Sequence, residues 1–168
     1  TANNQPFTFT NAMQTHGGTY LKNKAEDDKL VLRFSGEIYY DETTIRQRDE
    51  STFNKDRVDA FKMNSFNVNA PNIYSISDDN INLSINSIPQ IGNENSIRIG
   101  IVAPITGLYK INVVEASNYM MNNNIYLEDL LLNKWHKISE SEYGFTTDAG
   151  DIADRFILHF GAVGLEEP

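Results

Sequence analysis

Apolar and polar residues alternate along most of this chain. In residues 81–88, Ile81, Leu83 and Ile85 fall on one side and Asn82, Ser84 and Asn86 on the other. A period of two over five to eight residues predicts a β-strand with one buried face. The same alternation predicts further strands over residues 6–12, 29–36, 42–48, 73–77, 96–102, 108–114 and 155–161.

Turn-forming residues separate these runs. Ser77–Asn80 (SDDN) lies between two alternating runs and predicts a hairpin turn, while Gly92–Asn95 and Pro104–Gly107 interrupt the chain further on. Short strands at a spacing of about 8 to 12 residues are typical of sandwiches and barrels. We therefore predict an all-β fold, an antiparallel β-sandwich of jelly-roll character, as a single domain over residues 1–161.

Residues 122–140 allow two interpretations. Leu127, Leu130, Leu131 and Trp135 follow helical spacing and would form one face of an amphipathic helix. The same residues can instead form two strands, at 125–132 and 135–139, joined by a tight turn. Periodicity alone slightly favours the helix, although a single helix is inconsistent with the strands that precede it.

The C-terminal part of the chain resembles a pattern found in type IX-secreted surface proteins of the Bacteroidota. The similar residues are the strand IYLED at 125–129, followed by Ile138, Tyr143, Phe145, Gly150, Asp154, Arg155, Phe156, Leu158, His159 and Phe160. Upstream, the segments DETTIR, DAFK, LSINSIP and GLYKI are also similar, so the resemblance extends from about Leu32 onward.

This resemblance implies a β-sandwich that precedes a C-terminal sorting domain, with residues 162–168 as the start of the linker. It implies strands rather than a helix in residues 122–140, and a location that is secreted or on the cell surface. It implies no reaction, because the shared residues are of the kind that form a core, and fold does not determine function.

Composition and charge exclude several classes of function. The formal net charge is −9 with a pI near 4.7, which disfavours nucleic acid as a partner. No apolar run approaches the ~18 residues of a spanning helix, so we expect no membrane insertion. The absence of cysteine excludes disulfides, thiolate nucleophiles and sulfur-ligated zinc. We expect a monomer.

Residues 39–62 contain the densest mixture of acids and bases in the chain. The acids are Glu37, just outside the segment, and Asp41, Glu42, Asp49, Glu50, Asp56 and Asp59. Two of them could act as an acid/base pair in a polysaccharide-degrading enzyme. The basic residues Arg46, Arg48, Lys55 and Arg57 nearly balance these acids, which favours a structured, solvated loop beside an edge strand. The resemblance adds that Asp41, Arg46 and Asp59 match positions where an ion pair could organise this loop.

Acidic turns make calcium the most credible metal. Asp148, Asp151 and Asp154 surround Gly150, and a second group consists of Asp78, Asp79 and Asn80. Calcium prefers six to eight oxygen ligands, which loop carboxylates and carbonyls can supply. The alternative is that these residues form turns through hydrogen bonds to their own backbone. We expect no cofactor to be required, with Ca²⁺ as the one ion that these turns could bind.

A glycan site requires exposed aromatic rings beside amides or carboxylates. The candidates are Trp135, Tyr39 and Tyr40, with Asn123 among the asparagines at 122–124. The alternative is that these large rings pack in the core, as most do. The three histidines follow no metal-binding spacing.

Together these features predict a non-catalytic module of an exported bacterial cell-surface protein, which acts in adhesion or carbohydrate binding. The expected partners are a glycan or a cell-surface protein and the other modules of a parent polypeptide. The alternatives are a structural spacer that presents the sorting domain, or an enzyme that uses the carboxylates of residues 37–59.

Overall fold

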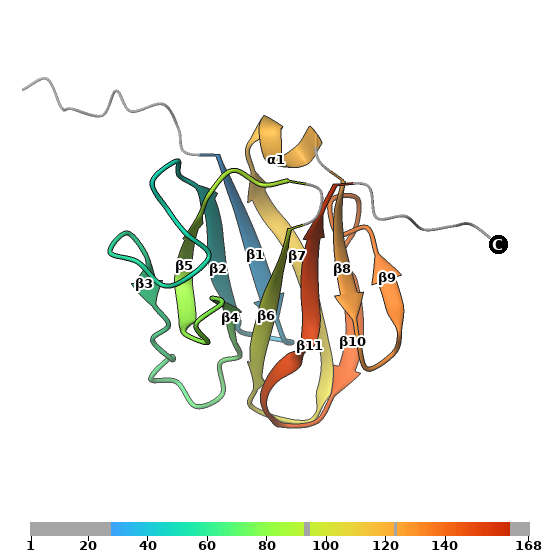
Figure 1. Cartoon of the computed structure of the whole chain (residues 1–168). Coiled ribbons are helices and arrows are strands. Elements are labelled where there is room, and N and C mark those ends of the chain that lie inside the picture. Colours follow the sequence, from blue (N-terminus) through green and yellow to red (C-terminus); the bar gives the residue numbers. More distant parts are fainter. Residues whose placement is uncertain (1–27, 93–94, 123, 162–168) are drawn as a thin grey trace, which may run out of the picture.

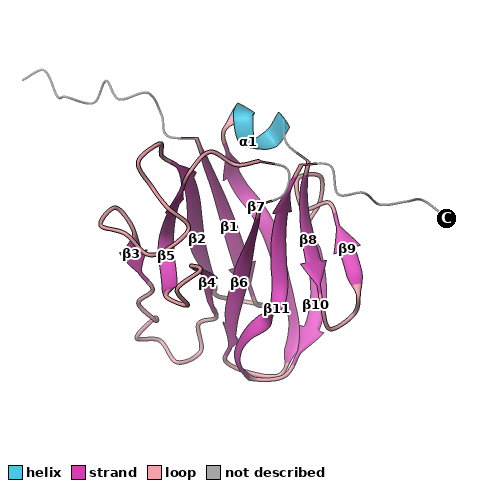
Figure 2. Ribbon diagram, viewed as in Figure 1, coloured by secondary structure: helices cyan, strands magenta, loops and turns pink. Residues whose placement is uncertain are grey.

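The computed structural model describes residues 28–92, 95–122 and 124–161, except the side chains of Tyr119 and Met121. These residues form eleven strands and one short helix, α1 (Asn118–Asn122) (Figure 2). The strands are β1 (Lys29–Ser35), β2 (Tyr40–Gln47), β3 (Ala60–Phe61), β4 (Asn72–Ile76), β5 (Asn82–Ile88), β6 (Ser96–Ala103), β7 (Gly107–Ala116), β8 (Ile125–Asp129), β9 (Lys134–His136), β10 (Tyr143–Thr147) and β11 (Gly150–Phe160). The all-β prediction is confirmed. The strand predicted at residues 6–12, Asn123 and the linker at 162–168 lie outside the described residues.

The strands form one nearly closed, barrel-like sheet in the order β10-β7-β1-β2-β5-β4-β6-β11-β8-β9, with β3 paired to β5. β2 and β5 are parallel, with Thr44 opposite Ile85 and Gln47 opposite Ile88. The sheet is therefore mixed, and the prediction of a purely antiparallel arrangement was wrong. The predicted sandwich of jelly-roll character is not confirmed, because the described strands belong to one continuous sheet.

Alternation builds the core as the sequence predicts. Every second residue of a strand points inward, so the inward faces of β1, β6 and β11 meet inside the barrel. These faces consist of Leu30, Leu32, Phe34, Ile97, Ile99, Ile101, Phe156, Leu158 and Phe160, all buried. Burial of each such side chain contributes about 1.5–3 kcal/mol. Helix α1 adds the fully buried Met120 at one end of the barrel.

Residues 125–136 form a hairpin and not a helix. β8 and β9 pair through Leu127–His136, Glu128–Trp135 and Asp129–Lys134. The turn between them ends at Asn133, whose φ of 49° lies in the left-handed region that asparagine tolerates. The SDDN hairpin turn is also confirmed, with Asn80 at φ 63° and its amide donating to the Ser77 carbonyl at 2.9 Å.

Side-chain contacts connect β10, at one end of the strand order, to β8 and β9 at the other end. The Tyr143 hydroxyl of β10 donates to Asp129 Oδ2 at 3.0 Å, and the Tyr143 and His136 rings lie 5.2 Å apart. Asp129 also receives Arg155 Nε at 3.0 Å and Arg155 Nη2 at 2.7 Å. A bulge between Ile152 and Phe156 in β11 allows Arg155 to turn inward to reach it.

Four connections lie at the end of the barrel opposite α1, and we call this the loop end (Figure 1). They join β1 to β2 (residues 36–39), β3 to β4 (62–71), β6 to β7 (104–106) and β10 to β11 (148–149). Hydrogen bonds tie two of them together, because Thr106 Oγ1 donates to Asp148 and accepts from the Ala149 amide at 3.2 Å.

Candidate functional site

A groove of about 710 Å³ lies at the loop end between the β1–β2 and β6–β7 connections. Its wall includes four exposed apolar side chains, namely Ile38, Tyr39, Ile105 and Leu108, which are 77%, 43%, 65% and 67% exposed. Glu37, Asn69 and Lys110 add polar groups to the wall. Contiguous exposed apolar surface is uncommon in folded proteins and marks contact sites.

Hydrogen bonds and packing hold the groove in shape. The buried Tyr109 accepts from the Ile105 amide at 3.4 Å and donates to the Ile105 carbonyl at 2.8 Å. Its ring stacks on Phe34 with centroids 4.9 Å apart. Gly36 passes so close that an added Cβ would lie 3.2 Å from the Tyr109 ring. The core therefore fixes the two connections that form the groove.

The β3–β4 connection, which contributes Asn69 and Pro71 to the groove, also carries exposed apolar side chains. Met63, Phe66 and Val68 are 78%, 100% and 84% exposed, and the neighbouring Asn69 already lines the groove. The connection is also fixed by its own polar side chains. Three amides, those of Ser65, Asn67 and Asn69, donate to Asn72 Oδ1, Ser65 Oγ and Asn67 Oδ1 at 3.0–3.1 Å.

Charge is distributed unevenly between the connections. Residues 63–72 and 104–109 contain no charged side chain, whereas residues 48–59 contain seven. The loop end therefore carries few charges for a chain with a net charge of −9, since its four connections contain only Glu37, Lys62 and Asp148 as charged residues. Within the groove the only charged residues are Glu37 and Lys110, and Lys110 pairs with Glu142.

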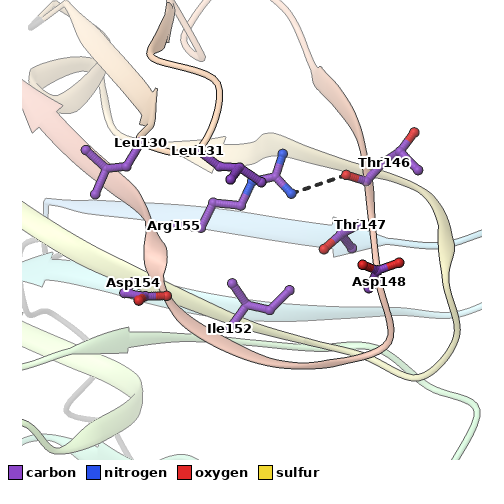
Figure 3. Close-up of a pocket in the computed structure, with 8 residues that line it drawn as sticks. All are labelled: Leu130, Leu131, Thr146, Thr147, Asp148, Ile152, Asp154 and Arg155. Atoms are coloured by element: carbon purple, nitrogen blue, oxygen red, sulfur yellow. Dashed lines mark hydrogen bonds between the residues drawn. The ribbon is translucent and has the colours of Figure 1, made fainter.

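A second hollow, of about 590 Å³, lies between β10, β11 and the β8–β9 turn (Figure 3). Two of the three predicted calcium ligands, Asp148 and Asp154, line it, with Ile152 between them in this view. The third, Asp151, accepts a hydrogen bond from the Tyr74 hydroxyl. In the described parts of the chain, no group of three or more His, Asp or Glu side chains could hold a metal ion. Calcium binding stays a prediction.

Arg155 forms the buried floor of this hollow. Its side chain is 4% exposed, donates to Asp129 and to the Thr146 carbonyl, and lies over the rings of Phe145 and Phe156. Burial alone would raise the pKa of Asp129, but hydrogen bonds from Arg155 and Tyr143 outweigh it and lower that pKa. Burial, with the hydrogen bond to Asp129, raises the pKa of Tyr143 to about 12. Arg155 of β11 therefore pairs with Asp129 of β8.

The residues predicted to bind a glycan lie on different elements. Tyr39 lines the loop-end groove, and Tyr40, which is 57% exposed, lies under the Arg33 guanidinium at 4.1 Å from the ring centroid. Trp135 lies on β9, half-buried, with its ring 4.5 Å from the ring of His159. The structure therefore brings Tyr39 to the groove and places Trp135 on a separate surface.

The acidic segment at residues 39–62 comprises β2, β3 and the hydrogen-bonded loop between them, residues 48–59. Asp56 and Asp59 accept from backbone amides, including Val58 N at 3.0 Å and Ser87 N at 2.6 Å respectively. Asp41 pairs with Lys62 and accepts from the Ile73 amide at 2.8 Å. These contacts agree with the prediction of a structured polar loop. The strand beside it, β2, lies between β1 and β5 and is not the edge strand that was predicted. The partner of Asp41 is Lys62, which was not among the residues that the resemblance suggested for an ion pair.

Sequence reasoning missed the apolar residues of the loop end. Ile38, Met63, Phe66, Ile105 and Leu108 have no regular period, since they lie in turns and at strand ends. The available signal was the presence of large apolar residues within segments rich in Asn, Pro and Gly, where polar residues are the norm.

The fold and groove define an all-β protein with a barrel-like sheet and an apolar loop end. The family model of a domain of unknown function (DUF8693) matches residues 1–160, and the chain belongs to this family. No curated protein and no solved structure matches the chain. In the described residues, no helix has the length and apolar character needed to cross a membrane.

Proposed function

We propose that this chain is a non-catalytic adhesion module of an exported bacterial surface protein, and that it contacts a protein partner through the loop end. The observation that carries the proposal is the apolar, sparsely charged surface formed by the groove and the β3–β4 connection.

The composition of this surface supports a protein partner. The cores of protein interfaces are depleted in charge and enriched in Tyr, Phe and Met, and Met63, Phe66 and Tyr39 are of these types. A lipid surface with anionic headgroups would favour basic side chains, which the surface lacks apart from Lys110.

The fixed backbone of the β3–β4 connection also supports binding. An exposed aromatic on a preorganised loop loses little conformational freedom when it enters a partner's pocket. Phe66 is fully exposed while the amides on both sides of it, Ser65 N and Asn67 N, are held by side-chain acceptors. Phe66 therefore has the properties of an anchor residue.

Two further observations support the non-catalytic and exported parts of the proposal. The carboxylates of Asp41, Asp56 and Asp59 already accept hydrogen bonds from backbone amides. They are therefore poorly suited to act as an acid/base pair. The resemblance of residues 125–161 to type IX-secreted surface proteins supports an extracellular location.

Selection from a peptide library displayed on phage tests the proposal with the full 168-residue chain as target. We expect the selected peptides to be rich in apolar residues, and to bind the variant Phe66→Ser/Ile105→Ser at least about tenfold more weakly. Leu131→Ser, which replaces an exposed leucine outside the groove, is the matched control and should bind normally. Selected peptides that bind both variants as tightly as the wild type would show that the loop end is not the contact surface.

A further inference from the structure

The outer face of β11, β8 and β9 carries a compact group of side chains that the loop end does not involve. Trp135 lies directly opposite Glu128, and His159 lies opposite Tyr126, so all four side chains project from the outer face of adjacent strands. The His159 Nε2 atom lies 2.8 Å from Glu128 Oε2. The inward neighbours Leu127 and Leu158 are buried in the core.

The Trp135 and His159 rings converge above β8. These residues come from β9 and β11, the two neighbours of β8, whose backbones are about 10 Å apart because adjacent strands lie about 4.8 Å apart. Their ring centroids are only 4.5 Å apart, with an interplanar angle of 40°. Both rings therefore lean over β8, above the Glu128 side chain, and Trp135 keeps part of its surface exposed.

We infer that this group is a platform for a neutral glycan. The C–H face of a sugar ring is apolar and slightly positive, so it stacks on the negative face of an indole. Glu128 can accept hydrogen bonds from sugar hydroxyls, and His159 and the Tyr126 hydroxyl can donate or accept them. A single, partly exposed ring flanked by hydrogen-bonding groups fits one or two sugar units of a chain lying across the strands.

Charge restricts the ligand class to uncharged sugars. Glu128 lies under the platform, and the net charge of the chain is −9, so a uronic-acid or sulfated polymer is repelled. Arg98, next in the row beyond Ile157, already donates to the Ser77 carbonyl at 3.1 Å and to Asn80 Oδ1 at 2.8 Å. A second cation, Lys137, lies close enough to Tyr126 to interact with it, and it pairs with Glu140 at 2.7 Å, so both cations are already engaged by protein acceptors.

Tryptophan fluorescence tests the inference directly, because Trp135 is the only tryptophan in the chain. We would titrate the full chain with cellohexaose, xylohexaose and mannohexaose, and run affinity electrophoresis in gels that contain the corresponding polysaccharides or polygalacturonate. The expected result is a saturable change in Trp135 emission with at least one neutral sugar. The same neutral polysaccharide should retard the protein, whereas polygalacturonate should not.

Two variants of the platform and one variant of the loop end separate this inference from the adhesion proposal. Glu128→Gln keeps the shape of the platform and should weaken sugar binding, and Trp135→Ala should reduce the retardation by about tenfold through loss of stacking. Phe66→Ser, at the loop end, should bind sugar as the wild type does. The inference is overturned if no neutral sugar changes the emission of the folded protein, or if Trp135→Ala is retarded as strongly as the wild type.

Discussion

Replacement of Asp129 by alanine should strongly destabilise the fold. The Asp129 side chain is fully buried and accepts hydrogen bonds from Arg155, Tyr143 and the amides of Leu131 and Leu132. Removing it leaves the Arg155 guanidinium, which is 4% exposed, with the Thr146 carbonyl as its remaining hydrogen-bond acceptor in the structure.

The expected loss of stability follows from the Arg155 charge, which stays buried without its partner. Breaking a buried ion pair by removal of one partner costs about 3–5 kcal/mol, because the other charge stays buried without compensation. A domain of this kind has a total stability of about 5–15 kcal/mol, so the change removes a large part of it. Asp148, an exposed carboxylate of the β10–β11 connection, is the control, and Asp148→Ala should change stability by less than about 0.5 kcal/mol.

Urea unfolding followed by circular dichroism measures the effect. The double variant Asp129→Leu/Arg155→Met should lose less than the sum of the two single variants, because it removes the isolated charge along with its partner. A cost below about 1 kcal/mol for Asp129→Ala, or strict additivity in the double variant, would refute the role assigned to this pair in joining β10 to β8.

Three further outcomes follow from the structure. The pKa of Asp129 is lowered in the folded state, so its contribution to stability is present above about pH 4 and is lost as the pH falls through the folded pKa; acid titration should therefore destabilise the wild type more than Asp129→Asn. Gly100→Ala should cost about 1–3 kcal/mol in urea unfolding, because the new Cβ would lie 2.2 Å from the Tyr74 ring, whereas Gly144→Ala, with no atom within 4 Å of the added Cβ, should stay within about 0.5 kcal/mol. If Asp148, Asp151 and Asp154 bind calcium as the sequence predicts, millimolar Ca²⁺ should raise the melting temperature by several degrees and EDTA should reverse the rise; an unchanged melting temperature would refute that site, in keeping with the hydrogen bond that Asp151 accepts from the Tyr74 hydroxyl.

The sequence predicted the strands well where alternation was regular. Ile97, Ile99 and Ile101 are buried as their period of two requires, and so are Phe156, Leu158 and Phe160. The prediction failed within β5, where Asn86 is 2% exposed and Ile85 is only half-buried. This strand pairs with β4 near its start and with β2 near its end, so its two halves face different neighbours.

Contacts between residues far apart in the sequence could not be predicted from the pattern of apolar and polar positions. The bulge in β11 turns Arg155 toward Asp129, which is 26 residues away in the chain, and no local spacing indicates this pair. The parallel pairing of β2 with β5 could not be predicted either, because alternation indicates which face of a strand is buried and not which strands are its neighbours.

The residues of the candidate site could be predicted only in part, for the same reason. Tyr39 and Trp135 were predicted to belong to one glycan site, yet they lie on separate surfaces, with Tyr39 43% exposed and Trp135 half-buried. The apolar side chains of the loop end carry no periodic signal, and they gather only because four connections meet at one end of the barrel.

The most direct test of the adhesion proposal is the attachment of beads coated with the full chain to cultured epithelial cells and to bacterial cells under flow. The account predicts that wild-type and Leu131→Ser beads attach to one of these surfaces, and that Phe66→Ser/Ile105→Ser beads detach at the rate of uncoated beads. Equal attachment of all three proteins, or no attachment by folded wild type, would contradict the assignment of the loop end as the adhesive surface.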